Sequence, residues 1–541
     1  MKKILQVFCL LTLCILLIGC NSDEVSLLEN RVRFYPLPEG AEEYTKEEVY
    51  LGDARLPMYS VKVNTSQVWT AENYQRIENG AGFFELDGKV TVTVKVHDAI
   101  NYKSKLRPLA AGIIPIADIE AQTLTFEIAS AGEYVLEING DLRRALYFFV
   151  SEFEETPYKP EDGQNFIYFG PGLHTKESNP QISSNNTVTL SSNTTVFLAP
   201  GAVVRAKFYA RNAENIKILG GGIISGSTFE RNARTGTATI PIEFNHCKNV
   251  ELSDFSIFDP AGWAVNFYYI NDSKINNLKI ISSRSNGDGI SIQSCKNITV
   301  DGCFVRSWDD SLVVKNYPLW ENRSVHGATE NITFKNCTIW TDLAQSMEIG
   351  YETVGKVMNN IAFENITVLH SLHKPVFSIH NGNNAEINNV RYENITVEDA
   401  SMGGGDAGVN DELIDFRVLY SENWSSQHTT TALGKIENVL VKNVKVLAGK
   451  KTAKIRISGC FDTRDGYQSK HYVSGIQIIN LTYKNVFVDE NYPYLLLGNF
   501  VSDVTISHEG LIRGATFVYT KTPQELALYG DELIVCEGIY E

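Results

Sequence analysis

The stretch Asn-Ile-Thr-Val-Asp-Gly-Cys at residues 297–303 decides the fold, because it returns along the chain. It recurs as Asn-Ile-Thr-Phe-Lys-Asn-Cys at 331–337 and as Asn-Ile-Ala-Phe-Glu-Asn-Ile at 360–366. Asn336, Asn365 and Asn394 follow one another at intervals of 29 residues. Short β segments repeated at this interval, with almost no helical periodicity, predict a parallel β-helix. The crossover rule makes that β-helix right-handed.

The repeat gives several polar residues a structural role. We expect the recurring asparagines to form a ladder at one bend, with side chains bonding to neighbouring backbone, because Asn tolerates tight turns. Cys303 and Cys337 share a repeat position with Ile366, so we expect stacked interior thiols there. No pair of cysteines has the CxxC spacing, so neither a zinc site nor an iron–sulfur site is expected. The sequence predicts no metal and no cofactor.

The N-terminus carries the pattern of an export signal. Two lysines precede the apolar run Ile4–Ile18, which is shorter than the roughly 20 residues of a membrane span. The run ends in Leu-Ile-Gly-Cys at 17–20, which resembles a bacterial lipobox, so we expect Cys20 to be lipidated. An ordinary signal peptide cleaved nearby is the alternative. The prediction is a protein lipid-anchored to the bacterial outer membrane, facing the periplasm or the cell surface.

The region between the signal and the repeat is rich in alternating strands. Lys89–Val96 and Thr123–Ile128 alternate apolar and polar residues with period two, which is typical of an antiparallel sandwich. A linker rich in Pro, Glu and Asp follows at 156–163. We therefore expect an all-β protein with three segments: a lipoprotein signal peptide at 1–19, a β-sandwich at 20–158 and a β-helix domain at 159–541.

Composition excludes some partners. The 541 residues include 48 basic and 64 acidic side chains, giving a net charge of -16. Nucleic acid is therefore not an expected partner, because its phosphates require a basic face. Hydrophobic residues make up 43% of the chain and charged residues 21%, which excludes a disordered protein.

One segment departs from the plain repeat. It contains Asn-Gly-Asp-Gly-Ile at 286–290, followed one coil later by Trp-Asp-Asp-Ser at 308–311. Because neighbouring strands lie about 4.8 Å apart, Asp288 can lie beside Asp309 and Asp310. Mutual repulsion would keep one of the three carboxyls protonated near neutral pH, as glycoside hydrolysis requires. Turn residues or calcium ligands are the alternative interpretation.

Side-chain parity places these aspartates at turns. Asp288 has the parity of Ile290, and Asp310 has that of Leu312, so on unbroken strands both would point into the core. Both must therefore lie at a turn or bulge just before a strand, which Gly287 permits.

The pattern Asn-x-Asp-Gly, then Asp-Asp one coil later, resembles two glycoside hydrolase families. These are family 28, the polygalacturonases, and family 49, the dextranases, and the resemblance covers about residues 165–400. The segments at 169–174, 198–203 and 347–351 are similar to family 49, as is a β-sandwich before the solenoid. The resemblance implies an inverting, metal-independent hydrolase.

Carried over to this chain, the resemblance assigns roles to the three aspartates. Asp309 matches the general acid, and Asp288 and Asp310 match the carboxylates that activate water. The Gly-His-Gly of polygalacturonases is replaced by Ala-Gln-Ser at 344–346, and their uronate-binding Arg-Ile-Lys by Ser-Ile-His at 378–380. These departures favour a neutral sugar over galacturonate.

Residues near the aspartates are candidates for substrate contact. Tryptophan rings can stack on sugars, although packing in the core is the alternative. His380 could touch substrate or be a buried bend histidine, and the insertion at 316–330 carries further aromatic residues. The predicted substrate-binding residues are Lys315, Glu348, Gln345, His380, Trp308 and Trp340, with Trp263 and Trp320 nearby.

Three functions remain open from the sequence. We favour an inverting glycoside hydrolase that cleaves O-glycosidic bonds in an extracellular polysaccharide, dextranase-like or polygalacturonase-like. A β-helix polysaccharide lyase would need a basic cluster for a uronate, and none is evident. A non-catalytic surface glycan-binding lipoprotein would suit lipid anchoring, but it has no use for clustered carboxylates.

Overall fold

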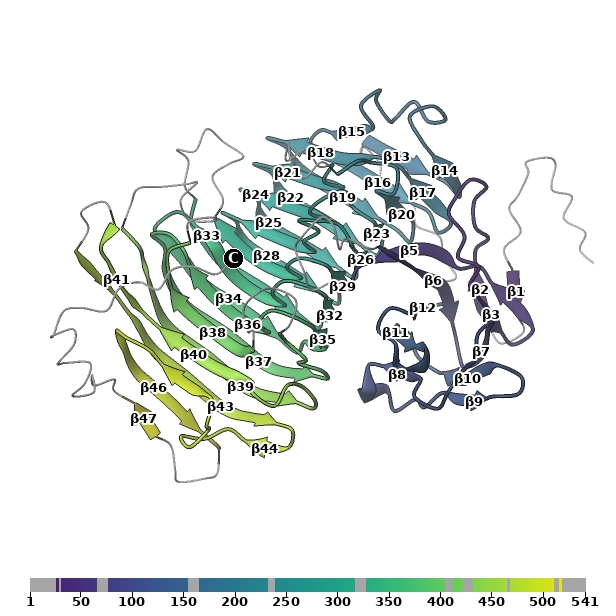
Figure 1. Cartoon of the computed structure of the whole chain (residues 1–541). Coiled ribbons are helices and arrows are strands. Elements are labelled where there is room, and N and C mark those ends of the chain that lie inside the picture. The colour runs from purple at the N-terminus through teal and green to yellow at the C-terminus, as the bar shows by residue number, and fades with distance from the viewer. Residues whose placement is uncertain are drawn as a thin grey trace, which may run out of the picture.

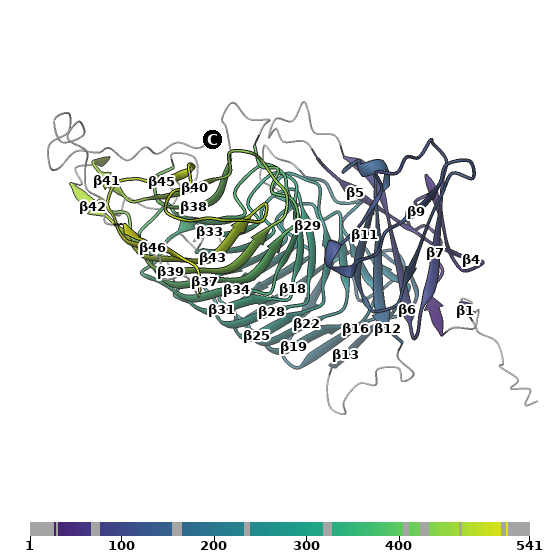
Figure 2. The ribbon, with the colours of Figure 1, turned by 90° about the horizontal axis from the view of Figure 1, so that it is seen from below.

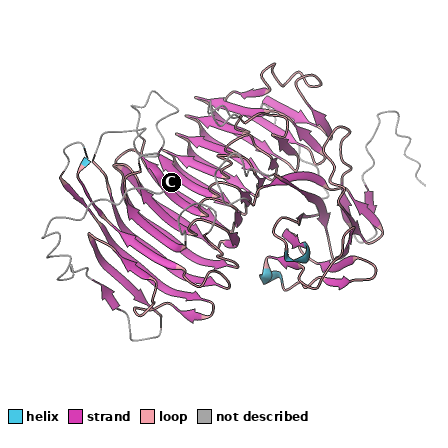
Figure 3. Cartoon of the chain, viewed as in Figure 1, coloured by secondary structure: helices cyan, strands magenta, loops and turns pink. Residues whose placement is uncertain are grey.

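The computed structural model describes residues 26–28, 31–65, 76–153, 165–231, 239–316, 327–403, 411–421, 432–464, 468–509 and 515–517. Predictions for the signal segment, Cys20 and Trp320 lie outside the described residues. The described chain forms a long β-solenoid with a smaller sandwich beside it (Figure 1). Strands dominate throughout (Figure 3). The described residues include no helix long and apolar enough to cross a bilayer.

The N-terminal sandwich consists of two sheets. One has the strand order β1-β2-β6-β12-β11-β8 with β5 paired to β6, and the other has the order β4-β3-β7-β10-β9. β6 and β12 pair in parallel, whereas the alternating pattern predicted antiparallel pairing throughout. The strands are β1 (Ser26–Leu28), β2 (Val32–Phe34), β3 (Glu47–Leu51), β4 (Ala54–Leu56), β5 (Tyr59–Val63), β6 (Ile77–Leu86), β7 (Val90–Val96), β8 (Lys105–Arg107), β9 (Ile116–Asp118), β10 (Thr123–Ile128), β11 (Gly132–Glu137) and β12 (Ala145–Glu152). Two short 3-10 helices accompany them, η2 (Leu109–Ala111) and η3 (Ile138–Gly140).

The solenoid is a parallel β-helix with three ladders of strands, as the repeat predicted (Figure 2). The first ladder contains β13 (Asn165–Phe169), β16 (Thr194–Leu198), β19 (Glu214–Leu219), β22 (Lys248–Ser253), β25 (Asn271–Asn276), β28 (Lys296–Asp301), β31 (Thr329–Lys335), β34 (Val357–Glu364), β37 (Glu386–Val397), β39 (Lys435–Val446), β43 (Val473–Tyr483) and β46 (Val501–Ser507). The second ladder contains β14 (Gly172–His174), β17 (Ala202–Val204), β20 (Ile223–Ser225), β23 (Ser256–Phe258), β26 (Lys279–Ile281), β29 (Phe304–Ser307), β32 (Thr338–Thr341) and β35 (Thr367–Ser371).

The third ladder is an 11-stranded parallel sheet. It contains β15 (Thr187–Leu190), β18 (Lys207–Arg211), β21 (Ile242–Asn245), β24 (Val265–Tyr268), β27 (Ile290–Gln293), β30 (Leu312–Asn316), β33 (Met347–Thr353), β36 (Phe377–Asn381), β38 (Glu412–Val418), β40 (Lys454–Ser458) and β45 (Leu495–Leu497). Short antiparallel strands complete the C-terminal end, namely β41 (Cys460–Asp462), β42 (Ser469–His471), β44 (Val486–Phe487) and β47 (Ala515–Phe517).

The recurring asparagines form two rows along the first ladder, and not the single row that the sequence predicted. Asn331 donates to Asn297 at 2.8 Å in one row, and Asn365 donates to Asn336 in the other. The bonds join side chains of neighbouring coils, whereas bonds to backbone were expected. The backbone of these residues has positive φ, for example 59° at Asn331, which Asn tolerates better than most residues.

The interior of the solenoid is one continuous apolar core. Cys303, Cys337 and Ile366 all lie in it and are at most 1% exposed, which confirms their prediction as equivalent interior positions.

The sandwich packs against the outer face of the second ladder. Apolar side chains of both parts form a shared cluster that includes Tyr147, Phe149, Phe304 and Trp340. Trp340 is fully buried there, with the guanidinium of Arg306 over its ring at 3.8 Å. The prediction that Trp340 binds substrate is therefore wrong, because both faces of its ring are covered.

Buried ion pairs also cross this interface. Arg107 of the sandwich contacts Glu398 of the solenoid at 2.7 Å and Glu137 at 2.5 Å. His370 lies between Glu137 and Asp399, at 2.5 and 2.9 Å. His370 is thus structural, and these buried contacts join the sandwich to the solenoid.

Candidate active site

Three aspartates meet at one corner of the solenoid. Asp288 lies just before β27, and Asp309 and Asp310 lie just before β30 on the next coil. The backbone N–H of Gly289 donates to the carbonyl of Asp310 at 2.8 Å, so the two turns lie side by side. A Cβ at Gly289 would come within 2.5 Å of the Ser311 carbonyl, so only glycine fits. The turn placement predicted from side-chain parity is thereby confirmed.

A chain of buried hydroxyl groups stabilises the turn that contains Asp309 and Asp310. The Ser307 hydroxyl donates to the carbonyl of Asp309 at 2.7 Å and is 2.7 Å from the Ser311 hydroxyl. Ser311 is in turn 2.6 Å from the hydroxyl of Thr341 on the following coil. The N–H of Asp310 donates to the Asp309 carboxylate at 3.1 Å. The last bond orients the Asp309 carboxyl group, and the hydroxyl chain holds the backbone of the turn.

Lys315 connects two of the three carboxylates. Its Nζ lies 3.2 Å from Asp288 Oδ2 and 3.2 Å from Asp310 Oδ2. Glu352 is a third partner at 3.9 Å, and the ring of Trp263 lies 5.1 Å from Nζ. In the described part of the chain, Asp309 forms no ion pair.

This arrangement separates the ionisation of the aspartates. Burial raises the pKa of Asp309 well above its usual range, and the carboxylates of Asp288 and Asp310 raise it further. Burial also raises the pKa of Asp288, to about 7, although Lys315 acts in the opposite direction. Burial would lower the pKa of Lys315, but its carboxylate partners outweigh that effect and raise it well above its usual range. Lys315 therefore stays charged beside Asp288 and Asp310, and the proton is best held by Asp309.

A second buried charged cluster follows on the outer face of the third ladder. His380 on β36 lies 2.9 Å from Glu348 on β33 and 3.0 Å from Asp415 on β38. Arg417 binds Asp415 through two bonds of 2.5 and 2.6 Å, and Ser378 donates to Glu348. β33, β36 and β38 follow β30 in the third ladder, so this cluster lies on the coils that come directly after the aspartate corner.

The pKa values of this cluster follow from its pairing. Burial would lower the pKa of His380, but Glu348 and Asp415 raise it to about 9. Burial would raise the pKa of Asp415, but Arg417 and His380 lower it to about 2. His380 and Arg417 are therefore both charged and already neutralised by carboxylates.

The remaining substrate-binding candidates take several places. Gln345 occupies the same corner as Asp310 on the next coil, and its N–H donates to the Asp310 carboxylate at 3.2 Å. Glu348 and His380 pair with each other, so the buried alternative for His380 is correct. Trp308 is 1% exposed, so its ring presents no open face for a sugar, contrary to prediction. Lys315 contacts the aspartates themselves.

Sequence reasoning missed Glu352, Asp415 and Arg417. Glu352 reaches Lys315 because the pairing register shifts between Val314 and Asn316, and no sequence signal marks that bulge. Asp415 and Arg417 lie two positions apart on β38, so both side chains point to the same face, the outer one. A search of the later coils for outward charged residues would have found them.

The described residues contain no group of three or more His, Cys, Asp and Glu side chains arranged to hold a metal ion.

A protein-family model described as Glycosyl hydrolases family 28 matches residues 172–464. That range covers more than half of the chain and includes all three aspartates. The chain belongs to glycoside hydrolase family 28. As a family 28 member, it is a hydrolase of glycosidic bonds. No curated protein matches its sequence.

Two solved structures that are similar to this family 28 protein differ in how well they superpose on it. Dex49A from Penicillium minioluteum superposes with a TM-score of 0.58 at 15% identity, covering 89% of this chain and 100% of that one. An exopolygalacturonase from Thermotoga maritima gives a TM-score of 0.38 at 17% identity, covering 66% and 86% of the two chains. At these identities the likeness to Dex49A shows the fold alone.

Proposed function

We propose that this protein is an inverting glycoside hydrolase that acts on a neutral extracellular polysaccharide. The observation that carries the proposal is the unequal pairing of the three aspartates. Lys315 contacts Asp288 and Asp310 at 3.2 Å each and leaves Asp309 without an ion pair among the described residues. Asp309 is thus the best holder of a proton, beside two carboxyl groups that share the Lys315 ammonium, and hydrolysis by inversion needs such an acid and base at one site.

The roles follow from the protonation states. Asp309 donates its proton to the glycosidic oxygen as the bond from that oxygen to the anomeric carbon breaks. Asp288 and Asp310 orient a water molecule and accept one of its protons as the water oxygen bonds to the anomeric carbon from the opposite face. The products are a new reducing end with inverted configuration and a free hydroxyl on the departing sugar.

The charges near the aspartates support a neutral sugar. His380 has both ring nitrogens paired with carboxylates, and Arg417 makes two bonds to Asp415. Gln345 stands at the corner that follows Asp310 and brings no charge. A uronate would have to compete with these internal carboxylates for its cation.

Export and lipid anchoring rest on the N-terminal sequence. We infer that Cys20 becomes the lipidated first residue and places the enzyme on the outer membrane, where polymeric glycans are accessible. Labelling with radioactive palmitate tests this inference: a Cys20→Ala protein that still takes up label would overturn it.

A reducing-end assay tests the catalytic proposal. The protein from Ser22 onward is incubated with dextran, pullulan, galactan, rhamnogalacturonan and polygalacturonate, beside an Asp309→Asn variant. We expect product from a neutral glycan, and a rate about 10²–10⁴-fold lower in the variant, because a general acid contributes about that factor. Asp53→Asn, at an exposed position of the sandwich, is the matched control and should keep full activity. Equal rates for the parent and Asp309→Asn would exclude Asp309 as the acid.

A further inference from the structure

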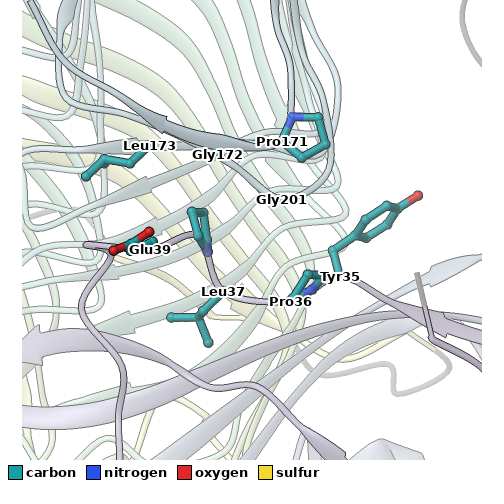
Figure 4. A pocket seen from close by; sticks show the side chains of 9 residues that line it. Tyr35, Pro36, Leu37, Glu39, Pro171, Gly172, Leu173 and Gly201 are labelled. Carbon is teal, nitrogen blue, oxygen red and sulfur yellow. The ribbon is translucent and has the colours of Figure 1, made fainter. Parts of the chain in front are cut away.

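A cavity of about 300 Å³ lies where the sandwich meets the first coils of the solenoid. The loop after β2 forms one side with Tyr35, Pro36 and Glu39, and the turn after β13 forms another with Pro171 and Leu173 (Figure 4). Its volume is at the lower end of the range of ligand sites, which runs from roughly 300 to 1,000 Å³. β14, which borders the cavity, belongs to the first coil of the solenoid (Figure 1), whereas the aspartates precede β27 and β30 several coils later.

A row of stacked aromatic rings adjoins this cavity. Tyr168 on β13 is 54% exposed. Its ring stacks on Phe197 of the next coil with centroids 6.2 Å apart and planes inclined by 5°. Phe166 stacks on Tyr168 from the same strand at 6.3 Å. A large aromatic side chain that keeps half of its surface in water is a signal of a binding surface when it has such neighbours.

The aromatic row comes close to the cavity at the turn after β13, where Tyr168 reaches Gly170, the neighbour of the cavity residue Pro171. A Cβ placed on Gly201 would lie 3.4 Å from both Tyr35 and Pro171, so these two side chains close over Gly201. Tyr168 precedes this turn by three residues, and its ring would lie 3.1 Å from a Cβ on Gly170. We call Tyr35, Phe166, Tyr168, Phe197 and the cavity the entry groove.

The apolar character is confined to the first coils. Tyr168 and Phe197 occupy equivalent outward positions on successive coils, and Leu219 occupies this position on the next one. On the later coils the residues at this position are polar, namely Ser253, Asn276, Asp301 and Lys335. If these aromatic residues only covered the outside of the solenoid, similar residues would recur at this position on every coil. The aromatic residues instead gather where the cavity is.

We propose that the entry groove is a second carbohydrate-binding site, which holds a neutral stretch of a polysaccharide outside the catalytic corner. Flat aromatic and proline surfaces suit the C–H faces of pyranose rings. Glu39 is the one charged side chain among the cavity's lining residues, all of which are described. Its carboxylate accepts hydrogen bonds from sugar hydroxyls and repels a uronate. Nearby Arg205 donates to the carbonyl of Gly40, so its charge is directed to the loop backbone.

The site acts by keeping a long chain near the enzyme. Two linked contacts with one polymer raise apparent affinity without any change at the catalytic centre. Short oligosaccharides cannot reach both places, so the groove should matter only for long chains.

Native affinity electrophoresis in gels containing dextran, pullulan, galactan or polygalacturonate tests the proposal. All proteins carry Asp309→Asn, so binding is measured without hydrolysis and independently of the proposed catalytic function. We expect at least one neutral glycan to retard the parent. Tyr168→Ala should weaken that retardation by about threefold to tenfold, the effect of losing one aromatic contact. Tyr168→Trp should restore it, and Tyr102→Ala, at an 81% exposed tyrosine of the sandwich, should leave it unchanged.

Three results would overturn the proposal: no retardation by any neutral glycan, equal retardation of parent and Tyr168→Ala, or retardation by polygalacturonate alone. Gel filtration of the same proteins adds a further test. A change in oligomeric state in Tyr168→Ala would show that the groove is a protein interface and would also overturn the proposal.

Discussion

Lys315 sets the chemistry of the aspartate corner at the scale of single residues. It comes from the same coil as Asp309 and Asp310, yet it forms its ion pairs with Asp288 and Asp310. In family 28 polygalacturonases a histidine is expected on the following coil, where this chain has Gln345. The cation beside the two carboxylates that we propose activate water thus comes from β30 of the third ladder.

Replacing Lys315 by Met should shift the acidic side of the pH profile to higher pH. The ammonium favours the ionised form of Asp288, so its loss raises the pKa of that carboxyl. In the proposed mechanism Asp288 must be ionised to activate water, so activity would disappear at a higher pH as the solution is acidified. The measurement is kcat/KM from pH 4 to 9 on the glycan found in the reducing-end assay.

A purely structural role for Lys315 predicts something different. The variant would then lose activity by the same factor at every pH, with both sides of the profile unmoved. Lys89→Met provides the control, since that lysine is largely exposed on the sandwich and its ion pair among the described residues is with Glu127.

At the scale of elements, β33, β36 and β38 together place Glu348, His380 and the pair Asp415–Arg417 in one buried cluster. His380 carries a positive charge between Glu348 and Asp415, and Arg417 adds a second cation beside Asp415. Tyr351 stacks on the His380 ring at 4.4 Å. Buried charges are tolerated only when paired, so each strand depends on its neighbours for the pairing.

The stability of the protein should therefore fall at alkaline pH through His380. Its pKa is raised to about 9 in the folded protein, above the roughly 6.5 of an unfolded chain. The stabilisation is fully present below about pH 6.5 and is lost as the pH rises through about 9, and it amounts to about 3 kcal/mol. Melting temperatures between pH 6 and 10 measure the decline.

A His380→Gln protein should melt lower at pH 6 and show a much flatter decline. His97→Gln, at an exposed histidine, should keep the parent's pH dependence. Parallel curves for the parent and His380→Gln would show that His380 is uncharged in the folded protein.

The sequence predicted elements well where the repeat is regular. The coil period directly gave the β-helix, and the interval between Asp288 and the Asp309–Asp310 pair placed three carboxylates at one corner. The sequence predicted the charged residues of the site less well where the coil period is interrupted. The bulge after Val314 brings Glu352 to Lys315, and the coil from β36 to β38 is longer than its predecessors, so Asp415 and Arg417 were missed.

For the molecule as a whole, the sandwich covers the second ladder and determines which outward residues stay accessible. Period-two alternation shows that Trp340 points out of the solenoid core, but it does not show that a separate set of strands covers that face. The prediction for Trp340 failed for this reason. The third ladder, which carries the aspartates, lies outside that contact.

The interface should make the sandwich and the solenoid unfold together. Arg107→Ala would leave Glu398 buried without the cation that it contacts and would remove one partner of Glu137, which costs about 3–5 kcal/mol. Scanning calorimetry should show one transition for the parent and a lowered or divided transition for the variant. Arg55→Ala removes an exposed pair with Glu43 and should cost at most about 1 kcal/mol. Two separate transitions in the parent would contradict this view of the interface.

The configuration of the first product tests the central claim most directly. Proton NMR of the anomeric signals, recorded in the first minutes of cleavage of the neutral glycan found in the reducing-end assay, distinguishes the newly formed anomer before mutarotation. Hydrolysis at the three-aspartate corner predicts a product whose anomeric configuration is opposite to that of the cleaved bond, and no signal from Asp309→Asn. A product with retained configuration, or an unsaturated product from a lyase reaction, would contradict it.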